Sequence, residues 1–492
     1  MVMVPKKPHQ GNDRGKRKPR HRILHLGSRF TALLALAFWV VTVPNAWAGA
    51  QGNHAAVGSQ IATPMDHLQE PSPSGPPITL TLQDALKRAE KYSPQFQAAV
   101  TAAKLAREDQ VQARAAMLPS ISYTTQYLNT QGNGISPVGR FVTNDGVHVY
   151  RAWAVVHESM PATFFFSAGP RSAAYAHALA QANEEIARRG LAVTVTNAYY
   201  ALALAQRQYA TAEQSVENAR RFLQISQELE QGGEVAHADV IRFQLQFNQQ
   251  QQALENAEVA MSTARLNLAV LLFPDLNQNF TIVDDLDVPP VLPTFNEVQI
   301  MARNNNPQIR AALMAYQQAR LNVSIARAAF YPSLSLDLDY GIEANAFALY
   351  SSTNTTRPGV RQPNLGYFAT YVLNVPIWDW GTSLSKLHQA EDQRNLARVN
   401  LSFAQRQLLS QLYSSYNEAQ AAWKQLDTLH NSVSLAARNL QLVTMQYKAG
   451  ETAALQVLDA ENSLSQARDA YAAGQVRYRS ALANLQTLTG SF

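Results

Sequence analysis

The chain has 492 residues, of which 46% are hydrophobic and only 16% charged, and it carries a net charge of +5. It contains no cysteine, which excludes disulfides, thiolate metal sites, a cysteine nucleophile and a lipid-acylated N-terminal cysteine. The first 48 residues carry nine Lys and Arg against Asp13 alone, a net +8, so the rest of the chain is about −3 and its charge gives no support to nucleic-acid binding.

Residues 1–48 have the pattern of a signal peptide. A basic stretch precedes the apolar run 30–41, and Ala46 and Ala48 then form the small-residue pattern of a cleavage site. We expect cleavage after Ala48. The alternative is an uncleaved anchor helix, but the apolar run is shorter than the ~20 residues that a bilayer crossing needs. The long basic stretch is also compatible with a translation start further downstream.

Residues 49–77 are rich in Gly, Ser, Pro and Gln, which predicts a disordered linker. Two similar repeats are predicted after it, over residues 78–290 and 291–492. The first opens with a helix that Thr81 caps and that passes Pro94 to about Met117. The second opens at Phe295 and passes Pro307. A proline-serine pair ends both helical stretches, at Leu118-Pro119-Ser120 and Tyr331-Pro332-Ser333.

After each proline-serine pair the hydrophobic period changes to two, which predicts β-strands with one apolar face. A second strand is expected to return in each repeat, and the loops at about 129–146 and 344–364 have the composition of exposed connections. The predicted strands are about ten residues long, which suits a tilted bilayer crossing in a β-barrel. The apolar positions are Ile121, Tyr123 and Tyr127 with a weaker strand at about 147–157, then Leu334, Leu336, Leu338, Tyr340 and Ile342 with Tyr367, Ala369, Tyr371, Leu373 and Val375.

Each repeat continues into a region with an apolar residue at every seventh position, and the two patterns are offset by 217 residues. A seven-residue repeat predicts coiled-coil packing with a left-handed supercoil. The first repeat has Val195, Leu202, Tyr209, Val216 and Leu223, then Val240, Phe247, Leu254, Met261 and Leu268. The second has Leu412, Ala419, Leu426, Val433 and Leu440, then Val457, Leu464, Tyr471, Tyr478 and Leu485.

Glycines interrupt this pattern at matching positions, Gly232-Gly233 and Gly450, where a left-handed glycine is expected to end one helix and let the chain reverse. The helix before each turn is predicted to run about 55–65 residues, or about 80–100 Å. That length fits a tube or a spanning rod rather than a compact domain. Four strands do not close a barrel, for which about eight are needed. A barrel would therefore be shared, with eight strands from two chains or twelve from three.

Several motifs stand in order along the chain: Leu82-x-Asp84-Ala85-Leu86 with Pro94, the two strand entries, Val375-Pro376-Ile377 with Gly381, Tyr447-x-x-Gly450, and Leu455-x-Val457-Leu458-Asp459-Ala460. With these motifs the chain resembles, over residues 78–490, the outer membrane efflux protein family, the TolC-like channel-tunnels. The resemblance implies a mainly helical fold with a membrane β-barrel. Three chains would share a twelve-stranded outer-membrane barrel and a long periplasmic α-barrel. It also implies a passive exit duct that works with a periplasmic adaptor and an inner-membrane pump.

The same resemblance implies an iris-like gate at the helix tips, where Gly232, Gly233, Gly450 and Glu451 would meet the adaptor. An inward Asp459 would form a ring of three carboxylates that attracts cations. A second family aspartate is Gln456 here, so we expect a weaker ring. Asp239 and Tyr447 match partners of the family's closing links. Thr452 replaces the basic partner, so either the gate is looser or a neighbour such as Arg242 substitutes.

Three other interpretations remain open from the sequence. A periplasmic coiled-coil adaptor would share the leader and the hairpins but not the paired strands, and a secreted structural or adhesive coiled coil would form no channel. An enzyme has the least support, because the chain has no zinc-protease, nucleophile-elbow or P-loop motif. We therefore expect no catalytic residue, cofactor or metal. The resemblance also implies that the chain contacts outer-membrane lipid.

Overall fold

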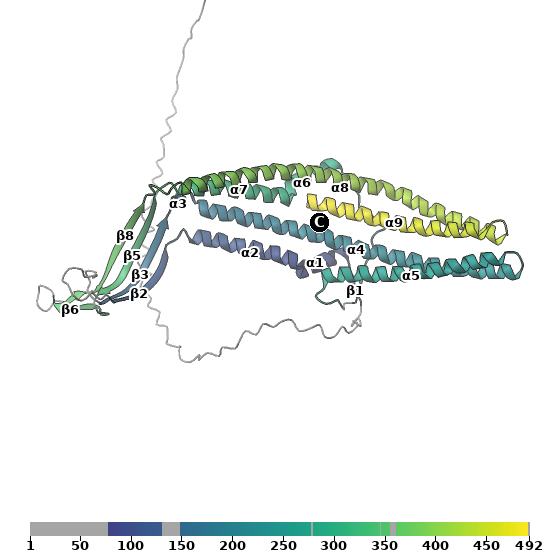
Figure 1. The fold of residues 1–492 in the computed structure, drawn as a ribbon, viewed down its shortest axis with the longest axis horizontal. Coiled ribbons are helices and arrows are strands. Elements are labelled where there is room, and N and C mark those ends of the chain that lie inside the picture. The colour runs from purple at the N-terminus through teal and green to yellow at the C-terminus, as the bar shows by residue number, and fades with distance from the viewer. Residues whose placement is uncertain (1–76, 130–147, 277–278, 345, 355–360, 491–492) are drawn as a thin grey trace, which may run out of the picture. The chain divides into compact units, whose positions relative to one another are not determined.

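The computed structural model describes residues 77–129, 148–276, 279–344, 346–354 and 361–490. The predicted signal peptide with Ala46 and Ala48, and all but the last residue of the 49–77 linker, lie outside the described residues. The chain divides into two units, residues 1–69 and 70–492. In the second unit a four-stranded sheet adjoins one end of a set of long helices (Figure 1).

Each repeat opens with two short helices rather than one. The predicted continuous helix through Pro94 is wrong. Instead α1 (Leu82–Tyr92) ends before Ser93, and α2 (Pro94–Ala115) begins after it. Ser93 is extended, because a residue before proline is pushed out of the helical region, and its hydroxyl accepts a hydrogen bond from the Phe96 amide.

The second repeat shows the same break between α6 (Phe295–Asn305) and α7 (Pro307–Ala328), with Asn306 as the cap. Thr81 caps α1 as predicted, through a reciprocal pair of hydrogen bonds with Asp84, and Thr294 caps α6 in the same way.

The sheet has the strand order β2-β3-β5-β8 and is antiparallel throughout. Its strands are β2 (Ser120–Asn129), β3 (His148–Met160), β5 (Ser333–Ala344) and β8 (Leu365–Asn374). The sequence placed all four, although β3 extends three residues beyond its predicted end. The sequence did not indicate the short parallel pair β1 (Ile78–Leu80) and β4 (Phe280–Ile282), nor β6 (Tyr350–Asn354) and β7 (Arg361–Pro363) within a predicted loop.

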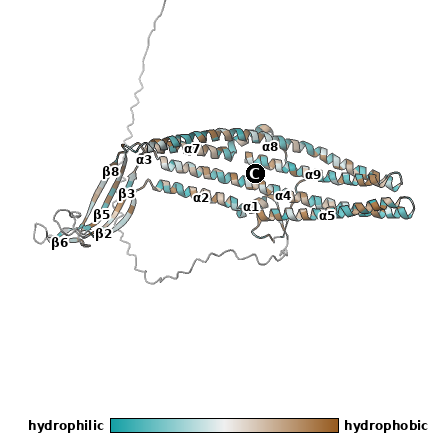
Figure 2. Cartoon of the chain, in the orientation of Figure 1, coloured by the Kyte–Doolittle hydropathy of each residue, from teal (hydrophilic) through white to brown (hydrophobic). Residues whose placement is uncertain are grey.

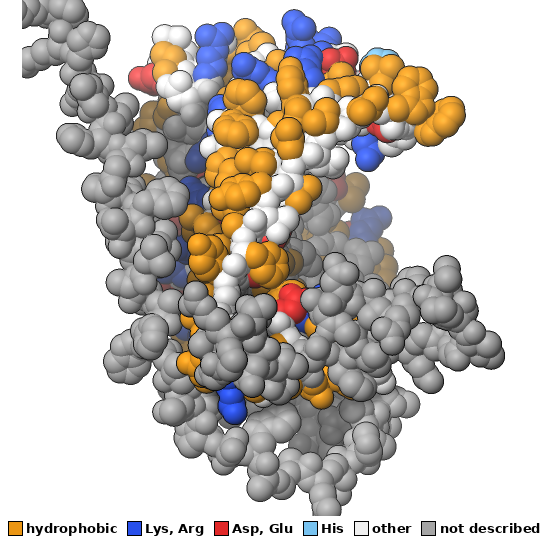
Figure 3. Space-filling view, turned by 90° about the vertical axis from the view of Figure 1, so that its left-hand side faces the viewer, with side chains coloured by type: hydrophobic (Ala, Val, Ile, Leu, Met, Phe, Trp, Pro, Cys, Tyr) orange, Lys and Arg blue, Asp and Glu red, His pale blue; other side chains and the backbone are white. Residues whose placement is uncertain are grey.

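The pairing register gives the sheet one mainly apolar face and one mixed face, which carries charged side chains together with Trp153 and Phe368, whose ring centroids are 5.4 Å apart. One row of directly opposed residues runs Tyr123, Ala154, Tyr340 and Tyr367. On the other face His157 contacts Asp337 (Nδ1 to Oδ1, 2.6 Å) and Arg151 pairs with Glu343 (Nη2 to Oε1, 2.7 Å). Figure 3 views this end of the unit and shows hydrophobic side chains gathered along the strands.

Two long helical hairpins follow the strands. After the short helix α3 (Ala162–Phe166), α4 (Ala168–Gln231) has 64 residues and turns into α5 (His237–Leu272). In the second repeat α8 (Thr382–Lys448) has 67 residues, two beyond the predicted range, and turns into α9 (Ala454–Thr489). None of the twenty seven-residue-repeat positions is exposed. Apolar and polar residues alternate along these helices (Figure 2).

No helix within the described ranges is both long and apolar enough to cross a membrane.

Candidate functional site at the helix tips

Both tip turns are built on one left-handed glycine. Gly233 has φ +76° and Gly450 φ +74°, 217 positions apart. In the first, the Gly233 amide donates to the Glu230 carbonyl (2.9 Å) and the Glu234 amide to the Leu229 carbonyl (2.9 Å). The second turn repeats both bonds from Gly450 and Glu451. This paired pattern satisfies the last carbonyls of the helix. Gly232 is a right-handed cap with φ −75°, so Gly233 is the left-handed glycine of the first turn.

An apolar cluster holds the two tips together. Phe222 of α4, Phe243 of α5 and Tyr447 of α8 are buried, and their rings form a chain with Phe243 in the middle. The ring centroids are 6.1 Å apart for Phe222 and Phe243 and 5.6 Å apart for Phe243 and Tyr447. Ala454 and Val457 of α9 complete the cluster. It therefore joins residues of both repeats at the end of the unit farthest from the sheet (Figure 1).

The structure brings Asp239 and Tyr447 close together at the edge of this cluster. Burial and the nearby Asp239 carboxylate raise the pKa of the Tyr447 hydroxyl, which has no hydrogen-bond partner among the described residues. The Asp239 carboxylate accepts from Arg242 one turn along the same helix (Oδ1 to Nη1, 3.0 Å). Arg242 thus pairs within the first hairpin and does not bridge the two hairpins.

Of the other predicted gate residues, Thr452 lies in the second tip turn, and Gln456 and Asp459 are exposed in the first turns of α9. The Thr452 hydroxyl donates to the side-chain oxygen of Gln456, and both belong to the second hairpin. Asp459 and Glu451 are exposed. In the described part of the chain, no hydrogen bond joins Thr452 or Gln456 to Asp239 or Tyr447.

Sequence reasoning missed a ladder of polar contacts between the two hairpins. Helices α4 and α9 run antiparallel, and three side-chain pairs join them at 2.6–2.9 Å. On α9 the three members are seven residues apart, which is a signal that the sequence did contain. The pairs are Arg207 with Gln475, Gln214 with Arg468, and Asn218 with Glu461.

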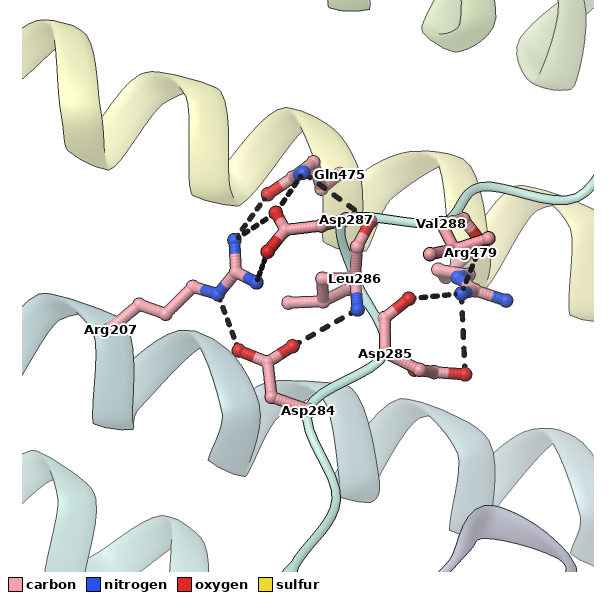
Figure 4. A network of polar contacts seen from close by, with 8 residues as sticks. All are labelled: Arg207, Asp284, Asp285, Leu286, Asp287, Val288, Gln475 and Arg479. Atoms are coloured by element: carbon pink, nitrogen blue, oxygen red, sulfur yellow. Dashed lines mark hydrogen bonds and ion pairs between the residues drawn. The ribbon is translucent and has the colours of Figure 1, made fainter.

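The segment between the repeats contacts both helices at the Arg207–Gln475 end of this ladder, which is the end farther from the tips (Figure 4). Arg207 of α4 contacts Asp284 (Nε to Oδ2, 2.6 Å) and Asp287 (Nη2 to Oδ2, 3.0 Å). Arg479 of α9 donates to the backbone carbonyl of Val288 (2.9 Å) and contacts the Asp285 carboxylate (3.2 Å). We call residues 284–288 with Arg207, Gln475 and Arg479 the clasp. The hydrogen bonds from Arg207 hold the pKa of Asp287 below its ordinary value.

Within the described ranges, no group of three or more His, Cys, Asp or Glu side chains is placed to hold a metal ion. Most polar side chains of the clasp, and Asp239, Arg242, Thr452 and Gln456 at the tips, are paired with one another, whereas the Tyr447 hydroxyl has no partner among the described residues. Their arrangement is suited to holding helices together.

A family model described as "Outer membrane efflux protein" matches residues 85–272 and 300–491. The chain is 26% identical to the alkaline protease secretion protein AprF of Pseudomonas aeruginosa over 432 residues, which cover 84% of this chain and 85% of the relative. It is also 26% identical to the cation efflux system protein CusC of Escherichia coli K12 over 283 residues, 56% and 58% of the two chains.

Solved structures share the fold at low sequence identity. The Campylobacter jejuni CmeC outer membrane channel has a TM-score of 0.68 at 18% identity, over 83% of this chain and 85% of that one. The open state of the Neisseria gonorrhoeae MtrE outer membrane channel has a TM-score of 0.68 at 22% identity, over 83% and 88%.

Proposed function

The chain belongs to the outer membrane efflux protein family and is located in the outer membrane, and we propose that three copies form a passive exit duct. In this proposal the sheets of the three copies close into one twelve-stranded barrel. The long helices continue it as a tunnel on the periplasmic side, and the energy for transport comes from a partner pump.

The observation that carries the proposal is the sheet, which is incomplete in one chain. Within the described sheet, β2 and β8 each pair on one side only. On the apolar face Tyr123 and Tyr367 are 70% and 79% exposed. Unpaired edges next to an apolar face are costly in water, and closure of several sheets into a barrel with its apolar face in lipid removes both costs. A periplasmic adaptor or a secreted coiled coil is not expected to contain a sheet with unpaired edges and an exposed apolar face.

We place the gate at the helix tips, where the apolar cluster of Phe222, Phe243 and Tyr447 joins the two hairpins. Opening would separate the hairpins, a change between two packings of the same helices. Exposed Asp459, repeated in three chains, would form a carboxylate ring at the constriction, weakened by the neutral Gln456. A periplasmic adaptor would contact the tip turns at Gly232, Gly233, Gly450 and Glu451.

The material exported is set in this proposal by the pump. The names of two relatives, one from protease secretion and one from cation efflux, show that similar chains serve different cargo.

Planar-bilayer conductance of the detergent-purified mature protein tests the duct, with wild type beside Asp459→Asn. We expect discrete channels that prefer cations, because a ring of carboxylates attracts cations and repels anions. The variant should still conduct, but in a salt gradient its reversal potential should lie closer to zero, because its preference for cations is weaker. The matched control is Glu255→Gln, an exposed acid in the middle of α5. Absence of channels would contradict the duct, and unchanged selectivity in Asp459→Asn would contradict the ring.

A further inference from the structure

The polar ladder ends near the tips in a buried acid. Glu461 lies two turns into α9, and only 3% of its surface is exposed. Its Oε1 atom accepts a hydrogen bond from Asn218 Nδ2 of α4 at 2.9 Å. Its Oε2 atom is buried and has no partner among the described residues. The residue 217 positions earlier is Gln244, which is neutral and exposed, so the buried acid belongs to one repeat only.

The groups around Glu461 are mostly neutral. The neighbouring contact between α5 and α9 joins the amides of Gln246 and Asn462 at 3.1 Å. The cation that acts on Glu461 is Arg468, one heptad further along α9, and its guanidinium donates to Gln214 of α4. Asn218 also lines a groove between α4 and α8, whose charged members are Arg221 and Lys448. No ion pair offsets the charge of Glu461 among the described residues.

Burial without an ion pair disfavours the charged form of a carboxyl group. Burial is the largest influence on Glu461 and raises its pKa above the ordinary value of 4.5, against smaller lowering influences from Asn218 and Arg468. The packed arrangement therefore favours the neutral acid, whereas an arrangement that admits water to Oε2 favours the carboxylate.

We propose that Glu461 is a proton-sensitive contact between the two tip hairpins: the neutral acid keeps α9 packed on α4, and ionisation favours their separation. This inference rests on the proposed gate and adds to it a residue outside the tip turns. The clasp holds α4 and α9 together at the end farther from the tips. A separation of the two helices at Glu461 would therefore move the tip ends of the hairpins apart.

The direction of the pH effect follows from the raised pKa. Below the unfolded value near 4.5 the side chain is neutral in every state, and the packed arrangement pays no penalty. As pH rises through the folded pKa, the packed arrangement loses stability relative to the open one. Each pKa unit of the difference corresponds to about a tenfold change in the ratio of the two arrangements.

The test is single-channel conductance of the full mature protein, recorded from about pH 4 to about pH 8, across the range in which a raised glutamate titrates. Wild type should show an open probability that rises with pH. Glu461→Gln keeps the size and the acceptor for Asn218 but cannot ionise, and it should stay at the low-pH level throughout. The matched control is Glu217→Gln, an acid next to Asn218 that is 55% exposed, and it should titrate like wild type.

A pH dependence that persists unchanged in Glu461→Gln would overturn the inference, as would conducting wild-type channels that are insensitive to pH. A second readout separates this failure from failure of the duct. Even without conductance, the melting temperature of wild type in detergent should fall relative to Glu461→Gln as pH rises. Equal pH slopes in the two proteins would overturn the role of Glu461 independently of any channel.

Discussion

At the scale of the residue, Arg207 is the most connected side chain of the clasp. It contacts two aspartates of the segment between the repeats and Gln475 of α9, so one guanidinium joins three parts of the chain. Its side chain is 24% exposed, which leaves these contacts less screened than ion pairs in open solvent. The acidic run Asp284-Asp285-x-Asp287 is visible in the sequence, but its partner is about 80 residues away. The sequence analysis did not single out this run, and contacts over such a separation leave no local pattern from which the pairing could be predicted.

Replacing Arg207 by alanine should lower the free energy of unfolding by about 1–2 kcal/mol, because it removes hydrogen bonds to charged groups at a partly buried site. Thermal unfolding in detergent measures the change. The control is Arg221→Ala on the same helix. Arg221 is 67% exposed and 3.9 Å from Glu217, so its loss should matter by no more than about 0.5 kcal/mol. Equal effects of the two variants would mean that the clasp adds nothing to stability.

At the level of the helices, the φ angle of one glycine in each tip turn determines where the helix ends and the chain reverses. Gly450 and Gly233 adopt positive φ, whereas Gly232 lies in the right-handed region. The sequence located both turns through the glycines, but it did not distinguish the two adjacent glycines of the first turn. The second turn resolves this, since Ala449 occupies the position equivalent to Gly232.

Gly450→Ala should destabilise the second hairpin by about 1–2 kcal/mol, because a Cβ atom at a left-handed position crowds the carbonyl oxygen that follows. Gly232→Ala is the matched control. Its φ is right-handed and the nearest atom to an added Cβ is 3.5 Å away, so it should range from neutral to about 1 kcal/mol stabilising. Melting temperatures compare the pair, and a loss of the same size in Gly232→Ala would argue against the backbone explanation.

Other elements were predictable for equally local reasons. The seven-residue spacing located the long hairpins because burial follows that spacing, and the change to a period of two located the sheet. The break at Ser93 was missed because apolar spacing continues across Pro94, while the extended conformation before proline ends α1. The pairing of β1 with β4 depends on contacts about 200 residues apart, for which three-residue strands leave no periodic signal.

At the scale of the whole molecule, one chain has an unfinished sheet and unpartnered apolar positions. On α5, Ile241, Leu245, Val259 and Val270 are exposed, although the seven-residue seam of the same helix is covered. Within one copy, the edge strands of the described sheet lack a second neighbour and these apolar side chains of α5 stay exposed to solvent. Both features support an assembly of several copies, and the number of strands per chain restricts how many copies close a barrel.

Native mass spectrometry of the mature protein, released from detergent, tests the shared duct most directly. We expect a species of three chains, because three sheets of four strands close into a barrel of twelve. It should persist at protein concentrations where a weak association would dissociate. A single chain as the dominant species would contradict a barrel shared between chains, since β2 and β8 would keep unpaired edges in the membrane. Two chains would contradict the twelve-stranded barrel and require an eight-stranded one.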